Sequence, residues 1–127
     1  MPDKHCYEYA VIRVVPRVER GEFFNAGVIL FCPARGFLQT TYALAEARLR
    51  VFEPAPDPAE LAARLEAFVR ICAGHPDGGL IGQQPRAARF RWLTAARSTV
   101  VQTSPVHPGL CTDPADTLAR LFAHLVG

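Results

Sequence analysis

The stretch of residues 26–32 constrains the fold most, because every residue in it is apolar and Pro33 follows directly. A short apolar run of this kind, bounded by a turn residue, predicts a strand that is buried on both faces. Two polar residues, Glu22 and Asn25, stand just before this run and beside two phenylalanines. Their position predicts either a polar turn or a polar site at the start of an apolar strand.

Other segments also have strand character. Residues 7–15 are rich in β-branched and aromatic side chains, and residues 37–42 follow a tight turn at residues 33–36. Together with residues 23–31 they predict an antiparallel meander, and residues 99–102 predict a fourth strand. A proline follows each of the first two strands and is expected to end it, because proline cannot donate to a ladder.

Three segments are predicted to be helical. Residues 43–52 carry apolar side chains on one helical face. The next helix starts at Asp57, a favourable N-cap followed by proline, and stops at Gly74. The last helix opens with the same chemistry at Asp113. Strands first and helices later predict an α+β fold: a small, mostly antiparallel sheet of about four strands with two or three helices packed on one face, which leaves the other face for a partner.

Length and composition predict a single domain over residues 1–127, since half of the 127 residues are apolar and can form a core without metals or disulfides. The four cysteines lack the paired spacing of a zinc site, so we expect no metal and no cofactor. The N-terminus has no secretory pattern, and the longest apolar run is far shorter than the about 20 residues of a membrane span. These features predict a cytoplasmic protein.

The net charge is only +2, but the charges are distributed unevenly. No aspartate or glutamate lies between Asp77 and Asp113, and a positive field there would attract phosphate or carboxylate. The alternative is a general use of arginine on the surface, since all but one of the 14 basic residues are arginine. The span contains four of them: Arg86, Arg89, Arg91 and Arg97.

Arg13 is the first candidate functional residue, because strand alternation puts it on the same mostly apolar face as Tyr9 and Val11. A guanidinium there needs a carboxylate or a bound anion, since an unpaired buried charge is strongly destabilising. Two interpretations are open. Either Glu22 forms an ion pair with Arg13 while Asn25 closes a bulge or turn, or the three side chains form a ligand site.

A second polar cluster lies late in the chain. Arg97 and Ser98 can offer a guanidinium and a hydroxyl to an oxyanion, and His107 is held between Pro105 and Pro108 in a predicted turn. The alternative is that the serine caps local backbone and the histidine packs beneath the loop.

Cys111 stands near His107 and Asp113, which are the residue types of a thiol nucleophile system. No known local signature surrounds this cysteine, so we predict no catalytic residue and leave enzymatic activity open.

The segments YAVIRVVPRVERGEFFNAGVILFCP and FRWLTAARSTVVQTSPVHPGLCTDP, with the closing helix, resemble a bacterial family of small domains of unknown function, DUF3037. The resemblance covers most of the chain, and it implies no established activity, cofactor or substrate. It does imply a genomic neighbourhood of kinase-like proteins related to the toxin half of a toxin–antitoxin pair. Ala96 stands where the family pattern has a proline. The motif residues map onto Arg13, Glu22, Asn25, Gly27, Arg97, Ser98 and His107.

The leading hypothesis is a non-enzymatic accessory module that acts with a protein partner, a kinase-like protein of toxin–antitoxin type. The alternative is a binder or modifier of a phosphorylated ligand, a nucleotide or a nucleic acid. Nucleic acid is the weaker of these, because Phe90 and Trp92 near the basic span are expected to be core residues and not a stacking platform. Both polar clusters would have to meet in one pocket to form the ligand site: Arg13, Glu22, Asn25, Arg97, Ser98 and His107.

Overall fold

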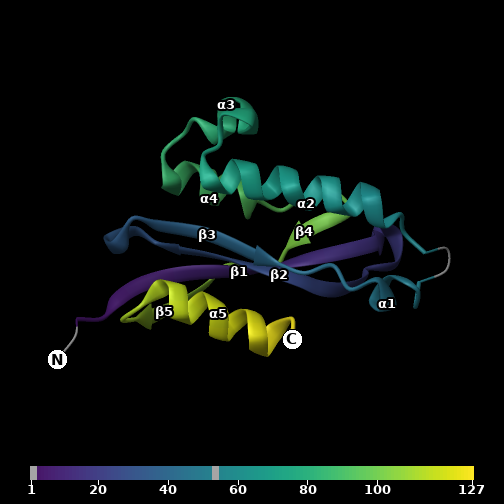
Figure 1. Cartoon of the computed structure of the whole chain (residues 1–127), viewed down its shortest axis with the longest axis horizontal. Coiled ribbons are helices and arrows are strands. Elements are labelled where there is room, and N and C mark those ends of the chain that lie inside the picture. Colours follow the sequence, from purple (N-terminus) through teal and green to yellow (C-terminus); the bar gives the residue numbers. More distant parts are fainter. Residues whose placement is uncertain (1–2, 53–54) are drawn as a thin grey trace.

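The computed structural model describes residues 3–52 and 55–127, and these residues form one antiparallel sheet with helices (Figure 1). The α+β prediction is therefore confirmed. The strands are β1 (His5–Arg17), β2 (Glu22–Cys32), β3 (Phe37–Tyr42), β4 (Val101–Thr103) and β5 (His107–Cys111). The helices are α1 (Glu46–Leu49), α2 (Pro58–Ala73), α3 (Gly79–Gly82), α4 (Arg86–Leu93) and α5 (Pro114–Leu125). Short 3₁₀ turns lie at Val18–Arg20, Pro33–Arg35 and Pro76–Gly78.

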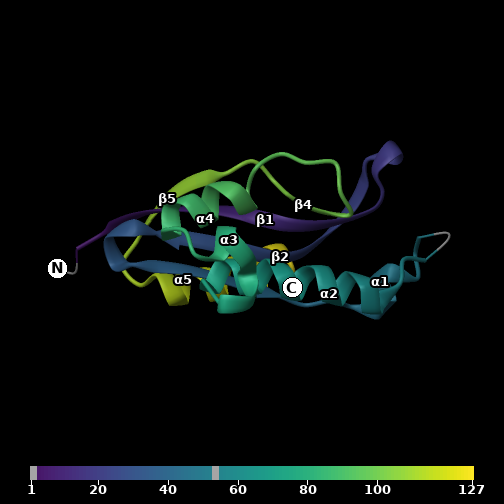
Figure 2. The ribbon, with the colours of Figure 1, turned by 90° about the horizontal axis from the view of Figure 1, so that it is seen from above.

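Strand β1 organises the sheet because it is long enough to pair with three neighbours. Strand β2 runs along one side of it, and β4 and β5 share the other side. β4 pairs with residues 12–14 of β1, and β5 pairs with residues 5–9. Figure 2 shows β5 and β4 following one another along the same side of β1. With β3 beyond β2, the order is β3-β2-β1-β4.

Helices cover both faces of the sheet, so the prediction of helices on one face is wrong (Figure 1). Ile29 and Phe31 of β2 lie in a core with residues of α2 and α4, whereas Val28, Leu30 and Cys32 lie in a core with residues of α5. An all-apolar strand requires this arrangement, because its successive side chains point to opposite faces. The chain's own last helix thus covers part of the face that the sequence left for a partner.

The capping signals at both long helices are confirmed. The Asp57 carboxylate accepts a hydrogen bond of 3.0 Å from the amide of Ala59 at the start of α2, and Gly74 ends the helix with a φ of 70°. Asp113 caps α5 in the same way, at 3.1 Å from the amide of Ala115. Within the described residues, no helix is long and apolar enough to cross a membrane.

Three local predictions are corrected. The helix predicted over residues 43–52 is reduced to α1. Strand β1 continues past Pro16 to Arg17. The β1–β2 pairing is irregular between Val14 and Arg17, so the lack of an N–H group in Pro16 removes no regular hydrogen bond of the ladder. The predicted turn around His107 is strand β5, which tolerates Pro108 because it lies at the edge of the sheet.

Gly27 lies opposite Tyr42 of β3, and a Cβ at this position would lie 2.6 Å from the carbonyl oxygen of Thr41. That oxygen belongs to the backbone and cannot move without disturbing the ladder. We expect Gly27→Ala to lower the free energy of unfolding by about 2 kcal/mol, measured by chemical denaturation. Gly109→Ala is the matched comparison, since its added Cβ would meet the ring of Tyr7, a side chain that can rotate. An equal or larger loss in Gly109→Ala would contradict the explanation.

Candidate functional site

Asn25 closes the C-terminus of the last helix. Its side-chain amide donates to the carbonyl oxygen of Leu125 at 3.0 Å. The guanidinium of Arg48 donates to the next carbonyl, that of Val126, at 2.8 Å and to the backbone oxygen of Asn25 at 3.2 Å. Carbonyl groups at a helix end have no partner within the helix, so these contacts supply the missing donors. The presence of Asn25 before the apolar run is therefore explained by its hydrogen bond to a residue 100 positions away in the sequence.

The predicted ion pair between Arg13 and Glu22 is wrong. Arg13 lies opposite Asn25 in the β1–β2 register, and the Glu22 carboxylate lies 3.9 Å from Arg20 instead. The guanidinium of Arg13 stacks over the ring of Phe23 at 4.2 Å. Its Nε is buried and has no hydrogen-bond partner in the described part of the chain. Among residues 3–52 and 55–127, no carboxylate therefore supplies the counter-charge that we expected for Arg13.

The two predicted polar clusters do not converge. His107 pairs with Tyr9 of β1, with ring centroids 5.4 Å apart, and Tyr9 belongs to the core beneath α5. His107 and Arg13 thus share the α5 face, but positions 9 and 13 of one strand are about 13 Å apart. Arg97 lies on the other face, beside α2 and α4, and Ser98 is exposed next to it.

A hollow of about 240 Å³ lies beside Arg97, between α2, α4 and the segment that leads into β4. We call it the α2/α4 groove. Its floor is apolar because the side chains that form it also pack on the core above the sheet. The floor consists of Phe68, Ile71, Leu93 and Val101.

The rim of the α2/α4 groove carries an aromatic ring and two cations. Trp92 is 40% exposed, and the guanidinium of Arg97 stacks over its ring at 4.2 Å while donating to its backbone carbonyl. Arg64 reaches the groove from α2 and is paired with Glu60 at 3.3 Å. The α2/α4 groove therefore combines an apolar floor with a positively charged rim.

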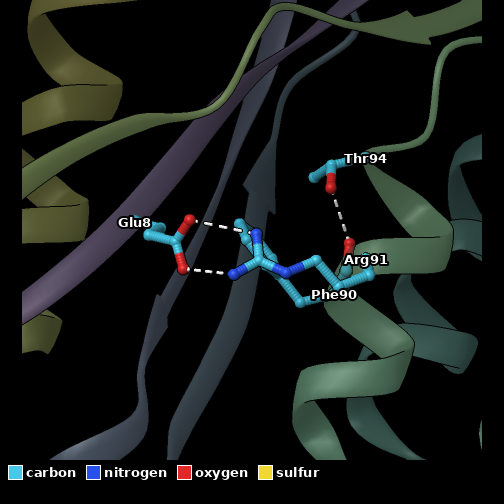
Figure 3. A network of polar contacts seen from close by, with 4 residues as sticks. All are labelled: Glu8, Phe90, Arg91 and Thr94. Carbon is cyan, nitrogen blue, oxygen red and sulfur yellow. Dashed lines mark hydrogen bonds and ion pairs between the residues drawn. The ribbon is translucent and has the colours of Figure 1, made fainter.

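The position of Trp92 depends on how α4 is fixed to the sheet. Arg91 donates two hydrogen bonds to the carboxylate of Glu8 in β1, at 2.6 and 3.0 Å (Figure 3). Phe90 is buried next to it and packs against Phe31 of β2, with ring centroids 5.3 Å apart. The Thr94 hydroxyl donates to the Phe90 carbonyl at 2.8 Å and closes the helix end, as Figure 3 also shows. These contacts hold α4 in an orientation in which the Trp92 side chain points outward.

A second hollow, of about 310 Å³, lies between α5 and the β1–β5 pair. Two of its polar groups are already partnered: Arg120 pairs with Asp116 at 3.1 Å, and the Thr117 hydroxyl donates to the Asp113 carbonyl at 3.0 Å. Burial raises the pKa of Tyr7 in its wall, so this phenol stays protonated. No group of three or more His, Cys, Asp or Glu residues that could hold a metal ion occurs in the part of the chain that the structure describes. The α2/α4 groove is the stronger candidate site.

Sequence reasoning placed Trp92 in the core and therefore missed it as a site residue. The signal was present in the helical spacing, since Phe90 and Leu93 are three residues apart and share the buried face. Trp92 lies off that face by the same periodicity. Phe90, by contrast, is a core residue as predicted.

We expect Asn25→Asp to lower the free energy of unfolding by about 2 kcal/mol. The new carboxylate would face the Leu125 carbonyl at the negative end of α5, where only a donor fits. Asn25→Ala should cost about 1 kcal/mol, because it removes the bond without adding repulsion. Gln39→Glu makes the same chemical change at an exposed site and should alter stability little. A smaller loss in Asn25→Asp than in Asn25→Ala would refute the capping role.

The thiols provide a test of the nucleophile hypothesis for Cys111. Burial raises the pKa of this thiol and that of Cys72, whereas an attacking thiol needs a lowered pKa. Cys6 is exposed and Cys32 is buried, so we expect one of the four free thiols to react rapidly with Ellman's reagent in the native protein. All four should react in denaturant, and Cys6→Ser should remove the rapid phase. A rapid phase that persists in Cys6→Ser would indicate a reactive buried thiol.

Comparison with known proteins adds the family. No curated protein and no solved structure gave a match to this chain. The model of one family, described as protein of unknown function (DUF3037), matches residues 9–126. The matched span includes β2, the α2/α4 groove and α5, as well as all the residues that the sequence singled out as candidates. The chain belongs to the DUF3037 family.

Proposed function

We propose that this chain is a non-enzymatic accessory module that binds a protein partner through the α2/α4 groove. The observation that carries the proposal is the half-exposed Trp92, with Arg97 stacked on it, at the rim of an apolar hollow. Tryptophan and arginine are the residue types most enriched among the side chains that dominate binding energy at protein interfaces. The kinase-like nature of the partner and the bacterial origin enter the proposal as implications of the family resemblance, and the cytoplasmic location enters it as an expectation from the sequence.

The size of the groove favours a protein segment over a whole small molecule. Pockets that enclose drug-sized ligands run to about 300–1,000 Å³, and this hollow has about 240 Å³. Such a space fits one or two apolar side chains of a segment that lies across it.

The charge at the groove indicates the character of that segment. Arg64 and Arg97 stand on its rim, and the stretch between Asp77 and Asp113 contains no acidic residue. Of the rim arginines, Arg64 is partly balanced by Glu60, while no carboxylate pairs with Arg97 among the described side chains. A segment with an apolar anchor and adjacent acidic residues complements this surface.

The alternative function, binding of a phosphorylated ligand, is less well supported by the geometry. It needs Arg13, Asn25, Arg97 and His107 around one ligand, and these side chains are divided between the two faces of the sheet.

We expect a photoreactive benzophenone residue in place of Ala67, which lines the α2/α4 groove, to form one dominant protein adduct in the native cells. The same residue in place of Leu80, which is 79% exposed on α3, should not form it. Adding Trp92→Ala or Arg97→Glu to the variant that carries the photoreactive residue at position 67 should lower the adduct yield at least about tenfold. Interface residues that dominate binding contribute about 2 kcal/mol or more.

Val51→Ala is the control substitution, because Val51 is exposed and lies outside the groove. It should leave the adduct yield unchanged, and thermal melting should show that every variant is folded. The proposal fails if positions 67 and 80 give the same adducts, or if the adduct survives Trp92→Ala.

A further inference from the structure

Arg13 and Phe23 form a cation–aromatic pair on the α5 face of the sheet, away from the α2/α4 groove. We infer that this pair is a second binding point, which receives a carboxylate side chain of a protein partner. The inference does not depend on the groove, because none of the groove's lining residues belongs to it.

The place of Arg13 in the sheet makes its charge unusual. It lies in the central strand β1, directly between Asn25 of β2 and Gln102 of β4. Its two neighbours on the same face of the strand, Val11 and Val15, are buried. A guanidinium in such surroundings is normally matched by a carboxylate of the same chain.

The chain provides no such match among the described residues. The amide groups beside Arg13 are committed elsewhere, since Asn25 donates to the Leu125 carbonyl at 3.0 Å and Gln102 to the Thr99 carbonyl at 2.8 Å. Glu22 lies next to Arg20. The Nε of Arg13 is buried and meets no partner among the residues that the structure describes, which is a destabilising arrangement. A side chain that lowers the stability of the fold and is nevertheless present is a candidate for a functional role.

Phe23 defines how an incoming group reaches the cation. Phe23 is 46% exposed and its ring lies 4.2 Å from the guanidinium carbon, so it forms an apolar wall beside the half-buried Arg13. Because Nε is covered, a carboxylate meets the two terminal nitrogens end on. Partial desolvation of the guanidinium strengthens that contact relative to one at a fully solvated arginine.

The surroundings favour a carboxylate over a phosphate. The C-terminal end of α5 is linked through Asn25 to the position opposite Arg13, and this end of a helix carries partial negative charge. The Arg48 guanidinium at this end is already committed to the carbonyl oxygens of Asn25 and Val126, so Arg13 alone meets the incoming group. One guanidinium balances a single negative charge better than the roughly two charges of a phosphate group. A singly charged Asp or Glu side chain is therefore the expected occupant.

The first test is a titration of the wild-type protein followed by the side-chain Nε–Hε signals of arginine in ¹H–¹⁵N NMR spectra. Sodium acetate, inorganic phosphate and sodium chloride are compared at equal ionic strength, and Arg13→Lys assigns the signal. We expect acetate to shift the Arg13 signal saturably and more than chloride or phosphate does. Arg50, which is exposed and paired with Glu46 at 3.7 Å, is the internal comparison. An Arg13 shift no larger than that of Arg50 overturns the inference, and a larger response to phosphate overturns the carboxylate assignment.

The second test separates binding from structure through Arg13→Met, which keeps much of the apolar stem and removes the charge. We expect this variant to melt about 3 °C higher than the wild type in chloride buffer, because an unmatched cation is gone. It should also lose any stabilisation by acetate. Arg50→Met is the matched control and should change neither property. A melting temperature well below that of the wild type would show that Arg13 is a structural residue and would refute the inference.

Discussion

The burial of β2 on both faces is the constraint on which the rest of the structure depends. Val28 and Ile29 are adjacent in the sequence and fully buried, yet they belong to different cores. Since each face of the strand must be shielded from water, the chain has to supply helices to both. Helix α5 therefore crosses the face opposite α2 and α4, and its end meets the head of β2, where Asn25 and Arg48 complete its hydrogen bonding.

The sequence predicts what is determined locally. The apolar run of β2, the Asp-Pro openings of α2 and α5 and the extent of β3 all depend on neighbouring residues, and the structure agrees with them. The contacts that decide the site join distant positions, such as Arg91 with Glu8, which are 83 residues apart. No local pattern reports such a pair. The misread segment at His107 shows the same limit, because prolines indicate a turn until a neighbouring strand is known to pair with it.

The structure contains an internal comparison for its two proposed sites. Among the described residues, three arginines stack on aromatic rings, and in one of these pairs both partners are satisfied within the fold: Phe90 is buried and Arg91 binds the Glu8 carboxylate. In the other two pairs the ring is exposed and no described carboxylate meets the cation. An arginine that only positions a helix thus looks different from Arg13 and Arg97. The contrast supports reading those two as surfaces that a partner completes.

Strand β4 connects these two surfaces. Val101 lines the α2/α4 groove, and the next residue, Gln102, lies beside Arg13 on the opposite face. Because Val101 and Gln102 are consecutive residues of this edge strand, only the thickness of the sheet separates the two surfaces there. One partner that passes around this edge could contact both without any movement of the sheet, and two partners could also bind independently. Successive residues of a strand point to opposite faces, so two neighbouring residues of a rigid sheet can belong to two different binding surfaces.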